Sequence, residues 1–524
     1  MRSRFQAGWK VGLVQKPTTA QRRKSLSRDL PALALDFPVS SDFSLPMIAR
    51  MNMSQASNSC NRSRIFRFFT AILLLVLPNT AATHTSEGGF VLLLPTDVYI
   101  VAGGLSVALT VLALFAVPAK TSVAFFRPVG AMPVKTTSLP IASSCGSAVI
   151  LFCLFWVGIE GPRDPLANPL PLAIWTVWWI GLVVIQGTIG NVWTWIDPWS
   201  GPLFLARRFC GMSPIARLPT KLGKFPAIAL FLCFSGFLLA DIAPSDPARL
   251  ARLVGLYWGL TLFGALIFGD RWRVQGDPIG LLMRSYGRMA ILGRRSRSLA
   301  FGFPGWQVFL RRNADLGTAV FVIVLLGSGS FDGLNETFWW LSLLGLNPLE
   351  FPGRSAVVWQ TMTGLLISNG LLLIVFGGCV WLGLNLAKSQ LKLRVAVCLF
   401  APTLLPIALA YHFAHYFTVF LVEAQYALAA ASDPWATGRD LLGLGTYYVT
   451  TGFFNTPDSV RVLWLTQAGS VVFGHIVAIA LAHAVAVRAF GSGVRATLSQ
   501  VPLAVFMVGF TIFGLWLLAS PRGL

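Results

Sequence analysis

The sequence predicts an all-α fold, a polytopic bundle of about ten transmembrane helices behind a cleaved signal peptide. Of the 524 residues, 55% are hydrophobic and only 12% are charged, whereas soluble proteins carry about 25% charged residues. The mean hydropathy is +0.68. Apolar segments long enough to cross a bilayer recur along the whole chain. This composition excludes a soluble enzyme, a disordered chain and a disulfide scaffold.

The N-terminal part divides into two segments before the membrane domain. Residues 1–50 mix Arg, Ser and Pro without a periodic apolar face, and we expect an unstructured or non-native upstream extension. Residues 51–83 have the order of a secretory signal peptide, with basic residues, an apolar stretch from Phe68 to Leu77 and small residues from Ala81 to Thr83. The integral membrane domain is therefore predicted to comprise residues 84–524.

Ten apolar segments follow the signal peptide and are the predicted membrane spans. They are residues 98–117, 141–159, 171–190, 225–242, 252–269, 316–330, 356–384, 394–428, 462–487 and 499–519. The sixth segment is short. The eighth is longer than a span needs and contains Pro402 and Pro406, which predict a kink or an extension beyond the bilayer.

The distribution of basic residues predicts how the chain is oriented. With a cleaved signal peptide, the five loops that alternate to the inside hold 22 Lys and Arg, and the outside segments hold 7. This bias is typical of cytoplasmic loops. We expect a multi-pass protein of the bacterial inner membrane with its mature N-terminus on the periplasmic side. The arginine-rich inside loop 270–315 is predicted to lie on anionic lipid headgroups.

The formal charge of +21 is therefore explained by the lipid bilayer as the partner, without nucleic acid. The sequence identifies no partner subunit.

The positions of all five histidines are informative. His412 and His415 fall in the eighth span, His475 and His483 fall in the ninth, and His84 lies at the predicted signal cleavage site. Ionisable groups inside a span are costly and tend to be functional. We therefore predict a site between the eighth and ninth spans.

Helical geometry places the polar residues of the eighth span on one stripe, at about 100° per residue. The members of this stripe are His412, His415, Tyr416, Glu423 and Tyr426. His475 is the expected partner of the stripe on the ninth span. His483 lies about 12 Å further along that helix, too far for one compact site with His475.

Two roles are open for these residues. They can form a hydrogen-bond network that joins the two spans. Alternatively, His84, His412, His415, His475 and His483 are candidate ligands of a divalent metal, copper or zinc, with haem less favoured. As the mature N-terminal residue, His84 would offer both an amine and an imidazole.

Two parts of the chain carry a family resemblance. His84, Pro95 and Tyr99 match a motif after the signal peptide, although Thr85–Gly89 and the missing Tyr-Asp-Leu-Pro part depart from it. Further matches are Tyr411-His412-Phe413-Ala414-His415-Tyr416, Ala431-Ser432-Asp433-Pro434, Gly474-His475 and Leu481-Ala482-His483. In these motifs the chain resembles a bacterial family of polytopic membrane proteins that carries the name fenitrothion hydrolase.

The resemblance implies hydrolysis of apolar organophosphorus triesters, with loss of an aryl group. His412 or His415, oriented by Glu423 and joined by His475, would act as the general base. A metal-bound hydroxide is the alternative nucleophile. Two other functions remain open, namely a copper- or haem-binding redox protein or metal carrier, and a proton-coupled secondary transporter.

Overall fold

The computed structural model describes residues 94–133, 139–295, 298–310, 314–351, 353–491 and 493–522. The chain divides into two units, Met1–Ala81 and Ala82–Leu524, and all described residues belong to the second. The predicted extension 1–50, the predicted signal peptide 51–83 and His84 therefore lie outside the described residues.

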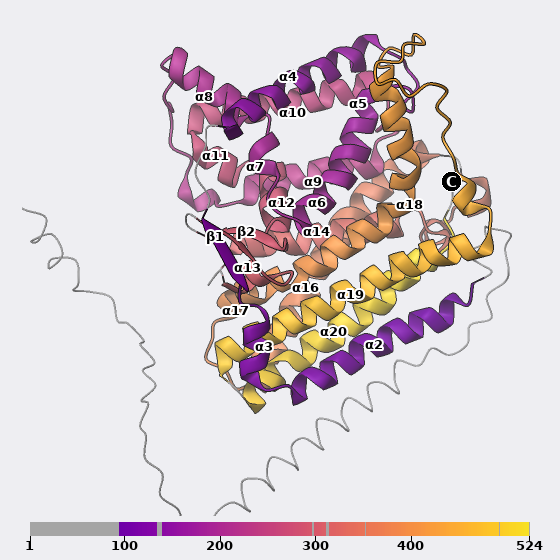
Figure 1. Cartoon of the computed structure of the whole chain (residues 1–524). Coiled ribbons are helices and arrows are strands. Elements are labelled where there is room, and N and C mark those ends of the chain that lie inside the picture. Colours follow the sequence, from indigo (N-terminus) through magenta and orange to yellow (C-terminus); the bar gives the residue numbers. More distant parts are fainter. Residues whose placement is uncertain are drawn as a thin grey trace, which may run out of the picture. The chain divides into compact units, whose positions relative to one another are not determined.

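The second unit is an all-α bundle, which confirms the predicted fold class (Figure 1). In the described part of the chain, nine helical segments are long and apolar enough to cross a membrane, and α9 (Phe225–Ala240) is a shorter apolar helix. These ten segments match the ten predicted spans in order. The nine are α2 (Thr96–Ala116), α4 (Leu139–Glu160), the continuous segment Pro169–Thr188, α10 (Pro247–Phe268), α14 (Leu316–Leu334), α16 (Val358–Leu386), the segment Leu393–Ser432, α19 (Pro457–Phe490) and α20 (Val494–Ala519).

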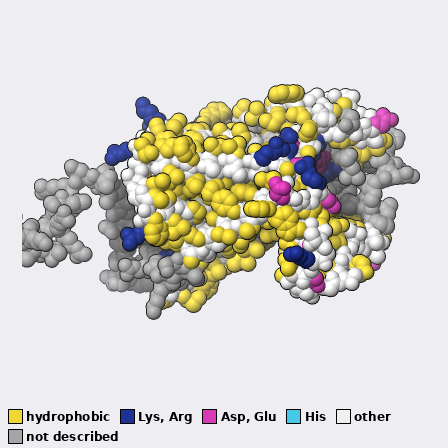
Figure 2. Space-filling model, turned by 90° about the horizontal axis from the view of Figure 1, so that it is seen from above, with side chains coloured by type: hydrophobic (Ala, Val, Ile, Leu, Met, Phe, Trp, Pro, Cys, Tyr) yellow, Lys and Arg dark blue, Asp and Glu magenta, His cyan; other side chains and the backbone are white. Residues whose placement is uncertain are grey.

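Apolar side chains cover most of the face seen in Figure 2, with few charges among them. On α16, for example, Trp359 is 81% exposed and Ile374 is 73% exposed. Water would penalise such a surface, while lipid tails accept it. The molecule is therefore a multi-pass membrane protein.

Helix α14 corresponds to the short sixth span of the sequence and lines the cavity that is described below. Fourteen of its 19 residues are buried. It packs against α9, α16 and the long helix α18 (Leu405–Ser432). It begins at Asp315, whose carboxylate accepts a hydrogen bond from the backbone N–H of Thr318, a typical N-cap.

The eighth span is broken where its prolines lie, as the sequence predicts. Helix α17 (Leu393–Phe400) is followed by a 3₁₀ turn, η7 (Ala401–Leu404), which contains Pro402. Helix α18 then begins, with Pro406 in its first turn, where proline's missing N–H is not needed.

The third span contains an unusual helix. Between α5 (Pro169–Pro171) and α6 (Val183–Thr188), the eleven residues of η3 (Leu172–Leu182) form a π-helix. π-Helical turns are rare and are frequently found at functional sites. The π-helix packs directly against α18.

The loops divide between the two ends of the bundle, which we name after the ends of α14. At the Asp315 end, β1 (Gly130–Pro133), β3 (Ser298–Phe301) and β2 (Leu292–Arg295) form an antiparallel sheet in that order. The other short elements of this end are α3 (Ala119–Phe125), α7 (Trp193–Ile196), α8 (Ser200–Phe209), η4 (Thr220–Leu222), α11 (Asp270–Gln275), α12 (Pro278–Tyr286) and α13 (Trp306–Leu310).

At the Asp332 end, an ion pair joins Arg163 to Asp246, and an isolated bridge joins Thr337 to Arg522. The remaining short elements are α15 (Phe338–Leu343), η5 (Pro348–Glu350), η6 (Arg354–Ala356) and η8 (Gly452–Phe454). These contacts join loops that an alternating path of ten spans puts on the same side of the membrane.

The prediction that residues 270–315 lie on the lipid surface is wrong for α12. Seven of its nine residues are buried, because α6, α9 and α18 cover the helix. Arg294 and Arg295 of β2 are exposed, as expected for charged residues.

Candidate functional site

A cavity of about 30 Å³ lies among η3, α9, α12, α14 and α18. We call it the His412 cavity. Its walls are mostly apolar, and its polar lining comes from Ser235, Tyr286, Ser328, Asp332, Tyr411, His412, His415 and Tyr416. A water molecule needs about 10–15 Å³ of such space, so the cavity has room for two or three.

His412 is held by the π-helix. Its Nε2 atom lies 2.8 Å from the backbone oxygen of Trp179, and the two rings meet edge to face at 4.9 Å. A carbonyl oxygen only accepts, so Nε2 carries the proton and Nδ1 carries the lone pair. Nδ1 has no hydrogen-bond partner among the described residues. The residue is 8% exposed and lines the cavity, so this nitrogen is shielded from bulk solvent.

His415, one turn further along α18, is bonded on both nitrogens. Its Nε2 lies 3.2 Å from Asp332, and its Nδ1 lies 3.4 Å from the guanidinium group of Arg522. Because arginine only donates, Nδ1 accepts and Nε2 donates to the carboxylate. His415 therefore has no nitrogen left for a water molecule.

Asp332 provides the carboxylate of the site. It receives a hydrogen bond from the Tyr416 hydroxyl in addition to the one from His415, and its side chain is 15% exposed. The positive charge of Arg522 stands behind His415, so the carboxylate is compensated in this apolar surrounding. Asp332 thus places one negative charge on the wall of the His412 cavity.

A second cavity, of about 150 Å³, adjoins the first and is called the Glu423 cavity. The two share three lining residues, Trp179, Leu238 and Tyr416. Glu423 does not contact a histidine here, because it lies about two turns beyond His415. Its carboxylate instead accepts a hydrogen bond of 2.5 Å from Thr176 of the π-helix.

The two histidines of α19 lie elsewhere. His475 is 1% exposed and donates from Nδ1 to the Val471 backbone oxygen of its own helix, and it does not line the His412 cavity. His483 lines a separate cavity of about 10 Å³ with Phe115 and Gln500.

The described residues contain no group of three His, Cys, Asp or Glu side chains that could hold a metal ion. At the His412 cavity, three of the four imidazole nitrogens are already bonded to protein atoms. The donor set of His412, His415, His475 and His483 therefore does not fit copper, zinc or haem. His84 lies outside the described residues.

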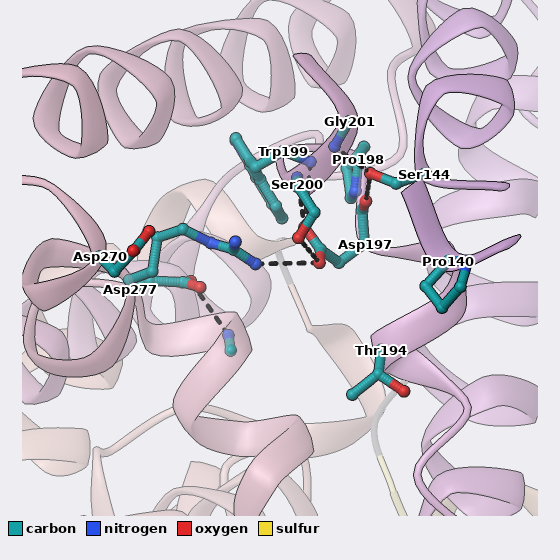
Figure 3. A network of polar contacts seen from close by, with 12 residues as sticks. Pro140, Ser144, Thr194, Asp197, Pro198, Trp199, Ser200, Gly201, Asp270 and Asp277 are labelled. Atoms are coloured by element: carbon teal, nitrogen blue, oxygen red, sulfur yellow. Dashed lines mark hydrogen bonds and ion pairs between the residues drawn. The ribbon is translucent and has the colours of Figure 1, made fainter. Parts of the chain in front are cut away.

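A polar network around Asp197 and Asp277 lies at the Asp315 end (Figure 3). Asp197 accepts a hydrogen bond from the backbone N–H of Ser200, the first residue of α8, and a 2.9 Å bond from Arg273 of α11. Asp277 caps α12 at Gly280 and accepts a 2.6 Å hydrogen bond from Tyr257. Burial raises the pKa of the Asp277 carboxyl. This network fixes the start of α12, the helix that brings Tyr286 to the His412 cavity.

Sequence reasoning missed Asp332, Arg522 and Trp179. Asp332 stands two residues past the end of the sixth span as the sequence predicts it. Arg522 is 107 residues from His415. Trp179 acts through its backbone oxygen, which has no signature in the sequence. Of the three, only Asp332 could have been found, as an acid within an apolar stretch.

No protein-family model, no curated protein and no solved structure matches this chain. The arrangement itself offers a buried site with an imidazole nitrogen that has a lone pair, a buried carboxylate and an adjacent, mainly apolar cavity. Such a site can activate a water molecule toward an apolar compound.

Proposed function

We propose that this chain is a multi-pass membrane hydrolase of small apolar esters, with organophosphorus triesters as the substrate class that the family resemblance implies. The observation that supports this proposal is the position of His412. The hydrogen bond from its Nε2 to the Trp179 backbone oxygen leaves Nδ1 as a base at a cavity of water size.

In the proposed reaction, a water molecule in the His412 cavity gives a proton to Nδ1 of His412. Its oxygen forms a bond to phosphorus, and the bond between phosphorus and the aryl oxygen breaks. The products are a dialkyl phosphate and an aryloxide, which takes up the proton from His412. The carboxylate of Asp332, on the wall of the same cavity, stabilises the transient imidazolium.

The substrate would occupy the Glu423 cavity, which is the larger of the two and is lined mainly by apolar and aromatic side chains. Trp179 and Tyr416 line both this cavity and the His412 cavity, which would hold the attacking water. The indole N–H of Trp179 is buried and has no partner in the described part of the chain. It is a suitable donor to the phosphoryl oxygen, where negative charge develops.

The bacterial inner membrane is the proposed location, with the Asp332 end outside and the Asp315 end in the cytoplasm. The supporting observation is that the loops of the Asp315 end contain most of the Lys and Arg of the membrane domain. Neutral triesters partition into lipid and would reach the site from the bilayer or from outside.

The test is hydrolysis of diethyl 4-nitrophenyl phosphate by the full chain purified in detergent. Exchanging His412 for Gln removes the base and should lower kcat/KM by about 100-fold or more. His483→Gln is the matched control, because His483 is a buried histidine of a separate cavity. Equal activity of His412→Gln and the wild type, at equal folded fractions, contradicts the proposal.

Proton-coupled transport is the second candidate, and one observation favours it. The His412 cavity and a cavity near Asp315 lie at opposite ends of α14, separated by fully buried residues such as Phe321 and Val322. Buried acids and histidines can relay protons in such proteins. Accumulation of the intact triester in proteoliposomes under a pH gradient, without release of nitrophenol, would support transport and contradict hydrolysis.

A further inference from the structure

The carboxylate that lines the Glu423 cavity has no cationic partner among the described residues. It accepts its hydrogen bond from the hydroxyl of Thr176, a fully buried residue of the π-helix. Because a hydroxyl is neutral, Thr176 does not compensate the negative charge of the ionised carboxylate. No Lys, Arg or His in the described part of the chain forms an ion pair with Glu423. A charge in a partly buried place is unfavourable unless an opposite charge joins it.

Arg354, the one basic residue in the described lining of this cavity, is already paired. Its guanidinium donates a 3.2 Å bond to the carboxylate of Glu336 and a 3.0 Å bond to the backbone oxygen of Leu238. The loops on either side also hold balanced pairs, which are Arg163 with Asp246 and Arg249 with Asp241. The charge of Glu423 is therefore left over, and the cavity is a place where a cation is stabilised.

Three aromatic side chains line the same cavity. The π-helix supplies Trp175 and Trp179, which are about one helical turn apart. Helix α18 supplies Tyr416, seven residues before Glu423 and thus on the same face of the helix. Trp175 is held in place, because its indole N–H donates a 3.2 Å bond to the backbone oxygen of Pro244. The faces of such rings attract organic cations, above all methylated ammonium groups.

From this combination we infer that the Glu423 cavity binds a small methylated ammonium ion, held by the carboxylate of Glu423 and by the aromatic side chains. An apolar cavity of about 150 Å³, the size found here, can hold benzene, and a trimethylammonium group is of similar size. A metal ion suits the wall less well, because hard cations need several oxygen ligands and the described lining offers one carboxylate. The inference concerns this cavity alone and does not depend on the proposed hydrolysis.

The test compares two ligands of the same shape that differ in charge. Choline carries a trimethylammonium group, and 3,3-dimethyl-1-butanol has a carbon atom in place of the nitrogen. Both are titrated calorimetrically into the full chain in neutral detergent at constant ionic strength, with titration into detergent alone subtracted. We expect choline to bind at least about tenfold more tightly than the alcohol. Equal affinities, or no binding of choline, overturn the inference, whether or not the chain hydrolyses triesters.

A first pair of variants assigns the binding to the carboxylate. Glu423→Gln keeps an acceptor for the Thr176 hydroxyl but removes the charge, and it should weaken choline binding at least about tenfold in Kd. Glu350→Gln is the control, because it removes an exposed negative charge of the same end of the bundle that does not line the cavity. Equal Kd values of the two variants overturn the inference.

A second pair tests the aromatic wall and leaves Glu423 intact. Trp175→Phe and Trp175→Leu both lose the bond to Pro244, but only the Phe variant keeps an aromatic ring. The Leu variant should bind choline at least about threefold more weakly than the Phe variant. Equal affinities of the two overturn recognition of the cation by aromatic side chains.

Discussion

At the scale of single residues, the site depends on which nitrogen of each histidine carries the proton. The Trp179 carbonyl fixes His412 with a free basic nitrogen, while Asp332 and Arg522 occupy both nitrogens of His415. Two histidines three residues apart thus have different roles. We assign His412 as the base and His415 as the residue that positions Asp332.

Asp332→Asn is the variant that tests the role of the negative charge. The amide oxygen can still accept from Tyr416 and His415, so the fold should change little. Loss of the charge should reduce hydrolysis at least about tenfold, because the imidazolium of His412 is no longer stabilised. Asp332→Ala leaves two buried donors unpaired and should also lower the free energy of unfolding, by about 1–3 kcal/mol for each. Activity and thermal unfolding of both variants separate the two effects.

Asp277 provides a pH-dependent prediction. Burial raises its pKa in the folded protein, so the unfolded chain ionises first as the pH rises. The contribution of Asp277 to stability is complete below its unfolded pKa of about 3.9 and is lost as the pH rises through the folded value. Asp277→Asn keeps the acceptor for Gly280 and Tyr257 and should remove this loss. Thermal unfolding of both proteins, measured as the pH rises from the unfolded pKa to the folded pKa of Asp277, tests this. Asp277→Ala removes the acceptor and should lower the stability at every pH.

At the scale of elements, close packing of α14 on α18 places Asp332 next to His415. Gly333 makes this approach possible, since a Cβ atom there would lie 2.0 Å from the Tyr411 hydroxyl. The π-helix is the second such element, because it presents the Trp179 carbonyl to α18. Gly333 thus permits the contact between Asp332 and His415, and the π-helix provides the contact between Trp179 and His412.

Gly333→Ala should therefore separate the two helices. Overpacking of this kind costs about 1–3 kcal/mol, and the loss of the Asp332–His415 contact should reduce activity as well. Gly329→Ala, one turn away on the same helix, is the control, because its Cβ would meet Tyr411 at an ordinary 3.9 Å. The midpoint of thermal unfolding and the rate of hydrolysis are measured for both variants. Equal losses in Gly333→Ala and Gly329→Ala would contradict a special role for the close approach at Gly333.

At the scale of the whole molecule, the contacts between loops agree with an alternating path of ten spans. If the Asp315 end is cytoplasmic, a C-terminal fusion should lie outside, because Arg522 pairs with the loop that follows α14. Alkaline phosphatase needs an oxidising compartment for its disulfides. It should therefore be active when fused after Leu524 and inactive when inserted between Ser389 and Gln390. The opposite activities would reverse the orientation.

The sequence predicted the spans well because hydropathy is a local property of each segment. It also predicted the break at Pro402, since proline acts on its own backbone. The site was predicted only in part. His412, His415 and Tyr416 do gather at one cavity, but their partners come from other helices, and His475 is bonded instead to Val471 of its own helix. Neither a π-helix nor a bonded backbone carbonyl is encoded by residue type.

In the proposed mechanism, a water molecule in the His412 cavity attacks phosphorus. This attack is tested most directly by hydrolysis of diethyl 4-nitrophenyl phosphate in ¹⁸O-labelled water, followed by mass spectrometry of both products. We expect one ¹⁸O atom in the diethyl phosphate, none in the nitrophenol, and loss of the labelled phosphate with His412→Gln. Label in the nitrophenol, or an unchanged yield of labelled phosphate from the variant, would contradict it.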